Sequence, residues 1–170
     1  MANGGGVIRI TPKRMAAQWQ KLRHRLEVNV YNFETAAGLA GVEVFKKSFD
    51  LKKFNTRGGS WWPARKNDKA KHPLLRETGT LQNSITYQLQ KGTGIRSVKI
   101  FTNPSAFNGA ARHPGFCYAA IHNEGGRGSG ASGAAANIEQ RQFIGDSTVL
   151  FERLLALQKK IFRGFPNANT

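Results

Sequence analysis

Hydrophobic residues in the first third of the chain recur every three or four positions, a spacing that predicts a long N-terminal helix. The repeat begins with Met15, Trp19, Leu22 and Leu26 and continues less regularly to Phe49. Thr11 can cap the start of this helix, and Pro12 suits its first position, where the missing N–H is not needed. We expect a bend either near residues 27–32 or near Gly38 and Gly41, because these residues are weak helix formers. A small sheet cannot bury so long a helix alone, so part of it is expected to pack on another subunit.

Alternating apolar and polar residues in the middle of the chain predict a β-hairpin. Residues 85–90 and 97–100 alternate in this way, and residues 91–94 between them contain two glycines, which favour a tight turn. Residues 73–79 predict a single helical turn that ends at Gly79, and Thr80 can cap a second turn. The sheet is therefore expected to be small and antiparallel, with one face exposed to water.

A second amphipathic helix is predicted near the C-terminus. Asp146 or Ser147 can cap its start, and Gly164 followed by Pro166 can end it. Its apolar stripe contains Leu150, Leu154, Leu157 and Ile161 and is widened by Phe151, Leu155 and Phe162. So broad a stripe is expected to pack against both the sheet and the first helix. The fold class is then α+β: a long N-terminal helix, a small antiparallel β-sheet, and a C-terminal helix packed on the sheet.

Glycine-rich and polar segments divide the chain into its expected parts. Residues 1–10 predict a flexible N-terminal arm, residues 11–164 a single α+β domain, and residues 165–170 a tail. Within the domain, long loops are expected at residues 103–116 and 123–140. The Gly/Ala/Ser run at 125–136 has no large apolar side chain to hold it, so we expect a mobile tether. After it, Ile138 and then Phe143 and Ile144 suggest a return strand.

Composition limits the class of protein. A chain of 170 residues that is 39% hydrophobic suits one modest core. The net charge of +16 attracts polyanions, but acidic protein surfaces, packaged DNA and ribosomal RNA would all satisfy it. The chain has no apolar run long enough to span a bilayer and no signal peptide pattern at its start. We therefore expect no membrane partner, and we expect the protein to be made in a cytoplasm.

The most basic segment spans residues 46–71. Its cations are the candidates for a polyanion contact: Lys46, Lys47, Lys52, Lys53, Arg57, Arg65, Lys66, Lys69 and Lys71. Trp61 and Trp62 lie among them and offer surfaces on which bases can stack. The alternative interpretation is a solvated loop that two tryptophans anchor to the core, since a glycine turn directly precedes them.

Residues capable of catalysis form no recognisable constellation. The four histidines lack zinc-ligand spacing, and the lone Cys117 has no base supplied by a motif. His122 beside Glu124 is the only acid/base-like pair, and we interpret His122 as a structural residue that hydrogen-bonds the backbone near Gly125 and Gly126. The sequence therefore predicts no enzyme, no cofactor and no metal site.

Four motifs taken together resemble the phage virion morphogenesis family, the tail-completion and head–tail joining proteins of tailed phages. They are the Trp-Trp-Pro at 61–63, the segment Leu-Arg-Glu-Thr-Gly-Thr-Leu-Gln-Asn-Ser-Ile at 75–85, Tyr-Ala-Ala-Ile-His-Asn-Glu-Gly-Gly at 118–126, and Arg-Gln-Phe-Ile-Gly at 141–145. Their order and approximate spacing match, and the resemblance covers about residues 15–163.

The resemblance implies a structural virion protein that is made in the host cytoplasm. Such a subunit is expected to form a homo-oligomeric ring, a hexamer, at the head–tail connector or the tail end. Its partners would be further copies of itself, neighbouring connector and tail proteins, and DNA passing through a central channel. The candidate subunit-interface residues are Trp61, Trp62, Tyr118, His122, Gly125, Gly126, Arg127, Arg141 and Phe143. The alternative function is sequence-nonspecific nucleic-acid binding by the basic 46–71 segment.

Overall fold

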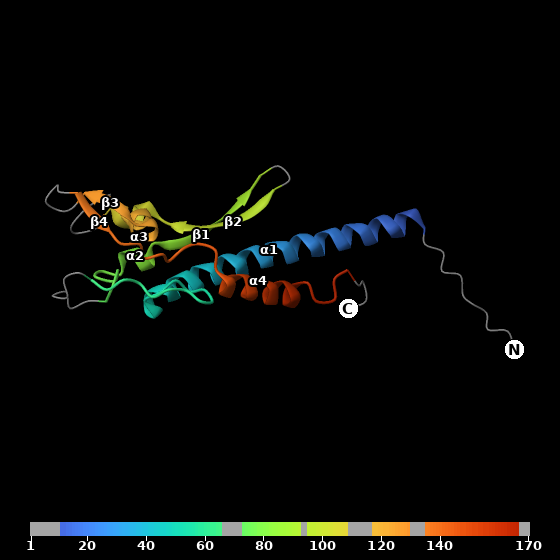
Figure 1. Ribbon diagram of the computed structural model, residues 1–170. Coiled ribbons are helices and arrows are strands. Elements are labelled where there is room, and N and C mark those ends of the chain that lie inside the picture. The colour runs from blue at the N-terminus through green and yellow to red at the C-terminus, as the bar shows by residue number, and fades with distance from the viewer. Residues whose placement is uncertain (1–10, 66–72, 93–94, 109–116, 130–134, 167–170) are drawn as a thin grey trace.

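One long helix is the axis on which the other elements pack. The computed structural model describes residues 11–65, 73–92, 95–108, 117–129 and 135–166. Helix α1 (Pro12–Leu51) packs against strands β1 (Ile85–Lys91) and β2 (Arg96–Thr102) and against helix α4 (Thr148–Ile161). Figure 1 shows the hairpin along one side of α1 and α4 along the other. The predicted α+β fold is confirmed, with both of its long helices and its antiparallel sheet.

Helix α1 is continuous over 40 residues and begins where the sequence indicated. The Thr11 hydroxyl accepts a hydrogen bond from the N–H of Arg14, and Pro12 occupies the first turn. The helix is unbroken through both places where we expected a bend. Gly38 and Gly41 lie where the hairpin packs on the helix. A Cβ on Gly38 would overlap the ring of Tyr87, and one on Gly41 would overlap the end of the Ile100 side chain. These glycines let the sheet approach the helix closely.

The β1–β2 hairpin has the predicted antiparallel pairing. Its register runs from Ile85 opposite Thr102 to Lys91 opposite Arg96. Ile85 is buried at the start of the hairpin, while Leu89 further along β1 is only half-buried. The hairpin is therefore best packed at the end nearer the core.

The segment before the hairpin differs from its prediction. Residues 73–79 form no helical turn; the Arg76 N–H bonds the Pro73 carbonyl, and Leu75 adopts a positive φ of 56°. Gly79, at φ 73°, precedes the short helix α2 (Thr80–Asn83) as its N-cap and does not end a helix. The prediction that Gly79 ends a helix is therefore wrong, and Gly79 takes the capping position that we expected for Thr80.

The glycine-rich run also differs from its prediction. Strand β3 (Gly126–Ser129) pairs antiparallel with β4 (Ala135–Ile138) after the short helix α3 (Ala119–Glu124). Main-chain groups form this pairing, and glycine and alanine keep those groups, so no large side chain is required. The predicted mobile tether is therefore wrong for residues 126–129 and 135–136, which belong to these strands.

Predicted loop and terminal segments lie partly outside the described residues. The 103–116 loop begins with a 3₁₀ turn, η1 (Pro104–Phe107), and its remaining residues 109–116 are outside. The N-terminal arm, residues 1–10, and residues 167–170 of the tail are outside as well.

Helix α4 packs mainly on α1, so its contact with the sheet is smaller than the stripe suggested. Ser147 is the cap, with its hydroxyl accepting from the Leu150 N–H. The ring of Phe162 meets that of Phe33 edge-on at 6.2 Å. No residue of α4 is fully buried, and Phe151 is 61% exposed.

The core lies at the C-terminal end of α1. Its buried apolar residues are Val44, Phe45, Phe49, Phe54, Trp62, Leu81, Ile85, Phe107, Ala119 and Phe143. They come from the second half of α1, from α2, β1, η1 and α3, and from the segments around Phe54, Trp62 and Phe143. The first half of α1 contributes none, and residues 11–21 are all exposed.

Candidate functional site: linked loops and an uncovered helix

The two tryptophans of the Trp-Trp-Pro motif have opposite environments. Trp62 is buried, meets Phe49 edge-on at 5.4 Å, and donates its indole N–H to the Gln142 carbonyl at 2.8 Å. Trp61 is 70% exposed, and the Lys53 ammonium lies 5.1 Å from the centre of its ring. Trp62 therefore anchors the loop, while Trp61 is available to another molecule.

Arg141 joins this loop to the last motif. Its guanidinium donates to the Pro63 carbonyl from Nε and Nη2, both at 3.1 Å, and to the Ala64 carbonyl at 3.2 Å. Its main-chain N–H donates to the His122 carbonyl at 2.7 Å. Burial lowers the pKa of Arg141 from its usual value, and the Glu139 carboxylate at 3.3 Å opposes that shift. Arg141 is thus held within its own chain, and it ties together the three segments that contain Pro63, His122 and itself.

Asn123 makes a second link, and the sequence analysis did not select it. Its Oδ1 accepts hydrogen bonds from the N–H groups of Phe143 and Ile144, each at 2.9 Å. This side-chain bonding replaces strand pairing at residues 143–144, so the predicted return strand there is wrong and only the part ending at Ile138 is a strand. The available signal was an asparagine just before Glu-Gly-Gly, since short amide side chains often bond nearby backbone groups.

Tyr118 and His122, one turn apart in the segment that contains Asn123, pack against each other. The Tyr118 ring lies edge-on to Phe107 at 5.0 Å and to His122 at 5.6 Å. Burial raises the pKa of Tyr118, and burial together with the positive charge of Arg141 lowers the pKa of His122. The buried His122 Nδ1 has no hydrogen-bond partner, so the bond that we expected from the ring to the backbone is not formed there. The neutral ring is an interior packing group.

Gly125 and Gly126 turn the chain from α3 into β3. Both have positive φ, 74° and 125°, which side-chain-bearing residues rarely adopt. A Cβ on Gly125 would also lie 3.0 Å from the Gln140 N–H nitrogen. Arg127 follows, exposed on β3. Of the predicted interface residues, Trp62, Arg141 and the buried Phe143 therefore hold loops in place, while Trp61 and Arg127 face solvent.

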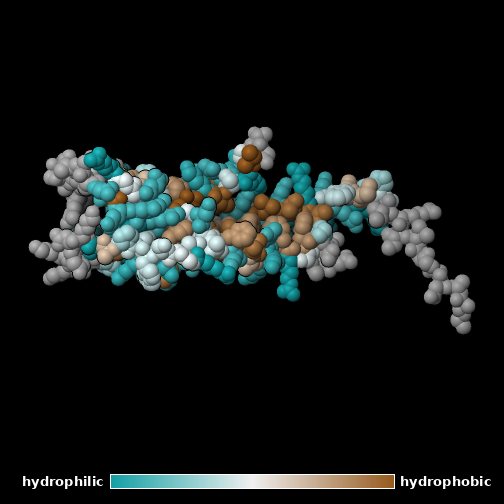
Figure 2. Space-filling model, in the orientation of Figure 1, coloured by the Kyte–Doolittle hydropathy of each residue, from teal (hydrophilic) through white to brown (hydrophobic). Residues whose placement is uncertain are grey.

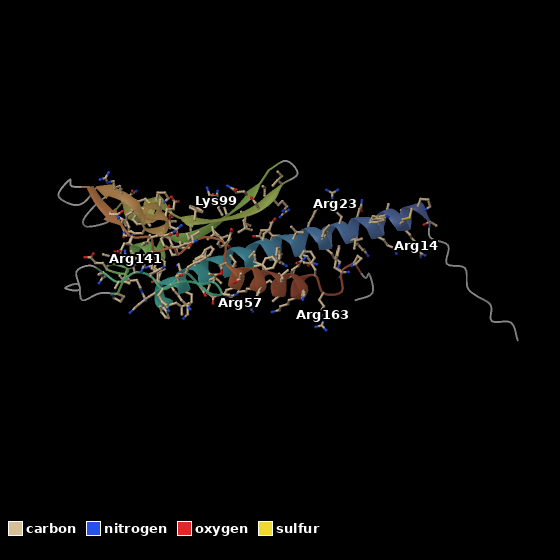
Figure 3. The ribbon with its side chains drawn as sticks, viewed as in Figure 1. Arg14, Arg23, Arg57, Lys99, Arg141 and Arg163 are labelled. Carbon is tan, nitrogen blue, oxygen red and sulfur yellow. The ribbon has the colours of Figure 1, made fainter. Side chains whose placement is uncertain are left out.

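The cations of the described part of this segment, residues 46–65, do not form one unpaired patch. Lys47 lies 3.7 Å from Asp50, Arg57 lies 2.8 Å from Glu152, and Arg65 donates to the Pro73 carbonyl at 2.8 Å. Lys66, Lys69 and Lys71 are outside the described residues. Figure 3 shows labelled cations along the whole length of the molecule, from Arg14 near one end to Arg141 near the other. Positive charge is therefore distributed well beyond this segment.

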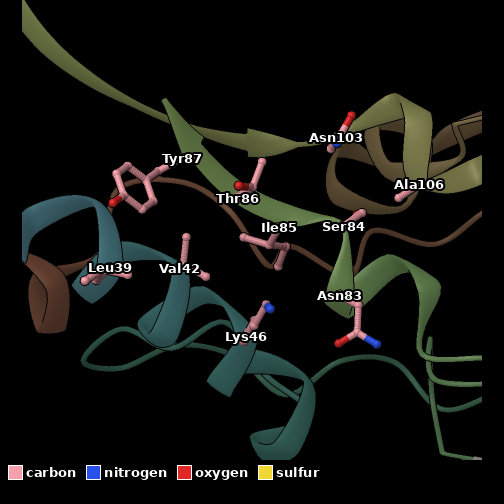
Figure 4. Close-up of a pocket in the computed structure, with 10 residues that line it drawn as sticks. All are labelled: Leu39, Val42, Lys46, Asn83, Ser84, Ile85, Thr86, Tyr87, Asn103 and Ala106. Atoms are coloured by element: carbon pink, nitrogen blue, oxygen red, sulfur yellow. The ribbon is translucent and has the colours of Figure 1, made fainter. Parts of the chain in front are cut away.

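A shallow hollow lies between α1 and the start of β1 (Figure 4). Of the lining residues drawn there, Lys46 alone is charged, and the Ser84 hydroxyl is already bonded to the Leu81 carbonyl at 2.7 Å. These lining groups contain no paired acid and base. Among the described residues, no three His, Cys, Asp or Glu side chains converge on a point where a metal ion could bind.

The first half of α1 exposes large apolar side chains that the rest of the described chain does not cover. Met15, Trp19 and Leu26 are 50%, 64% and 41% exposed. Figure 2 shows brown hydrophobic surface continuing along the part of the molecule where α1 extends beyond the other elements. Large apolar side chains exposed in a row are typical of a protein-binding surface. None of the helices in the described part of the chain is long and apolar enough to cross a membrane.

Comparison of the chain with protein-family models, with curated proteins and with solved structures finds no significant match. These comparisons therefore assign the chain to no family.

Proposed function

We propose that this chain is a structural virion protein that forms a ring at the head–tail connector or at the tail end. The observation that carries the proposal is the uncovered apolar surface of its helices. Trp19 and Met15 on α1 and Phe151 on α4 are each at least half exposed. A subunit with this much apolar surface is more stable when other proteins cover it.

The motifs behind the resemblance support the same proposal. Three of them, at 61–63, 118–126 and 141–145, are joined by the hydrogen bonds of Arg141, Asn123 and Trp62. This joined unit lies at the end of the molecule opposite the start of α1 (Figure 1). An elongated subunit with distinct surfaces at its two ends can contact its neighbours head-to-tail, and such contacts close into rings when the rotation between copies allows.

Electron microscopy of purified particles and of the isolated protein tests this proposal. We expect a ring of identical copies at the junction between head and tail or at the tail end, with the β3–β4 hairpin (residues 126–138) against a neighbouring copy. A variant in which this hairpin is replaced by Gly-Gly should keep the helical circular dichroism signal and lose the ring. A chain that is absent from particles, or present as single copies scattered over the capsid, would refute the proposal.

A second candidate function is sequence-nonspecific binding to nucleic acid, and the exposed Trp61 beside Lys53 favours it. Binding would then weaken steeply with salt, with a log–log slope of about 0.9 per phosphate contacted on duplex DNA. Fluorescence anisotropy of labelled duplex and single strands between low and physiological salt measures this slope. Trp61→Ala should weaken single-strand binding more than duplex binding, because stacking contributes only where bases are exposed. A slope near zero would refute this function.

A further inference from the structure

We propose that the first half of α1 binds an acidic amphipathic helix of a partner protein, side by side as in a coiled coil. This inference rests on the proposed function only in treating the uncovered helix as a protein-binding surface. The occupant that it names is a different protein and not a second copy of the chain.

The uncovered surface continues an interface that already exists within the molecule. Trp19, Leu26, Phe33 and Ala40 follow one another at seven-residue intervals, so they share one face of α1. Phe33 on this face is covered by Phe162, which directly follows α4. Beyond that contact α1 runs on without a covering helix among the described residues (Figure 1). A second helix placed in line with α4 would cover the remaining part of the face.

The shape of the apolar face favours a helix as its occupant. Met15 and Leu22 form a second seven-residue series beside Trp19 and Leu26, and together the two series make a narrow stripe. Asn29 is the next member of the Met15 series, and a polar residue inside such a stripe fixes the register of a partner helix. A helix that lies on a membrane has a wider apolar face, and a nucleic acid would contact the charges while leaving this stripe exposed.

Charge indicates the chemistry of that partner. Residues 12–31 contain five lysines and arginines and a single acid, Glu27, which already pairs with Arg23 at 3.0 Å. Arg23 and Arg25 occupy the positions that flank Leu22 and Leu26, where coiled coils place the charges that select a partner. Glutamates at the facing positions of another helix would meet these cations.

A second copy of the chain is a poor source of those carboxylates. The chain has ten acids against 26 lysines and arginines. Many of its acids are already in ion pairs with their own chain: Glu34 with Arg96, Glu43 with Arg153, Asp50 with Arg76, Glu139 with Arg141, and Glu152 with Arg57. Self-association through this half of α1 would therefore bring like charges together, and an acidic partner would not.

The probe is a synthetic three-heptad peptide with leucine at its core positions and glutamate at the flanking positions. Its binding to the full chain is measured by fluorescence anisotropy at about 0.15 M salt, where attraction between distant charges is largely screened. A scrambled peptide of the same composition controls for attraction by net charge. A peptide with lysine in place of glutamate controls for the sign of the charge. We expect the acidic heptad peptide to bind at least about tenfold more tightly than either control.

Two matched double variants locate the contact. Trp19→Ser with Leu26→Ser should weaken the acidic peptide's binding at least about tenfold, since central apolar anchors dominate such interfaces. Val28→Ser with Tyr31→Ser removes side chains of similar exposure that lie off the stripe on the same helix, and should change binding by less than about twofold. All four side chains are exposed, so neither variant should alter the fold.

Several outcomes would overturn the inference. Equal binding of the scrambled peptide would show that only net charge acts, and equal effects of the two double variants would place the contact elsewhere. Oligomerisation of the chain that Trp19→Ser with Leu26→Ser abolishes would make a second copy the occupant. Shielding of the Trp19 side chain from a fluorescence quencher by anionic vesicles or by duplex DNA, but not by the peptide, would identify the vesicles or the DNA as the ligand. The ring is observed independently by microscopy, so peptide binding without a ring would refute the proposed function alone.

Discussion

Replacing Asn123 with alanine removes the acceptor that joins α3 to the segment at 143–144. Its Oδ1 takes both the Phe143 N–H and the Ile144 N–H, each at 2.9 Å. Phe143 is only 1% exposed, so water reaches the freed donors poorly. Asn123→Asp offers the matched change, because a carboxylate of nearly the same shape keeps an oxygen in the accepting position.

The magnitude follows from the number of donors left without an acceptor. A buried polar group that loses its partner is destabilising by about 1–3 kcal/mol, and two groups are involved. The environment of Asn123 is half-buried, which favours the lower part of that range. We therefore expect Asn123→Ala to reduce the free energy of unfolding by about 2–4 kcal/mol. For a chain of this size that corresponds to a decrease in Tm of about 5–15 °C. Asn123→Asp should stay within about 1 kcal/mol of the wild type.

Urea unfolding followed by circular dichroism measures both variants. The midpoint should fall for Asn123→Ala at an unchanged m-value, because the folded state buries the same surface. The reasoning is refuted if alanine lies within about 0.5 kcal/mol of the wild type, a change typical of ordinary surface positions. It is refuted equally if aspartate is as damaging as alanine.

Three further predictions concern acid stability and close packing. Hydrogen bonding to Arg96 lowers the pKa of Glu34 below its usual value near 4.5, so this contribution is complete above that pH and is lost as the pH falls through the folded pKa. Glu34→Gln should flatten the acid limb of a plot of unfolding free energy against pH. Burial lowers the pKa of His122 below its usual 6.5, so stability should decline as the pH falls below about 6.5, and His122→Gln should remove that decline. Gly38→Ala should destabilise the fold by about 1–2 kcal/mol in urea unfolding, because overlap with the Tyr87 ring outweighs the better helix propensity.

Each of these three predictions has an outcome that would contradict it. The double variant Gly38→Ala with Tyr87→Ala should be more stable than Tyr87→Ala alone, since alanine at position 87 frees the space that a Cβ on residue 38 needs. Additive effects of the two changes would contradict the close approach. Unchanged acid limbs in Glu34→Gln and His122→Gln would contradict the assignment of those groups.

The two long helices and the β1–β2 hairpin were predictable because their signals are local. Thr11 with Pro12, and Ser147 with the stripe that follows it, define helix starts within a few residues. Alternation over a single segment was enough for β1. The candidate site was less predictable. Trp62 and Arg141 belong to segments that the sequence singled out, but the bonds between those segments join residues about 80 positions apart.

The sequence by itself determined the two long helices and the β1–β2 hairpin, and which face of each is apolar. Period and capping depend on neighbours within a few positions, and the printed chain contains all of them. It also determined the strongly basic character of the first half of α1.

Only the tertiary structure decided what lies against each face. Gly38 and Gly41 are points of contact with the sheet, which depends on Tyr87 and Ile100 far along the chain. The β3–β4 pairing uses main-chain groups that every residue carries, so side-chain patterns do not encode it. The C-terminal end of helix α4 meets the apolar stripe of α1 at Phe33, and that meeting point follows from the length of α4 and the place where it docks. A periodic stripe specifies a surface to be buried, and the arrangement of the whole chain decides how much of it the chain buries itself.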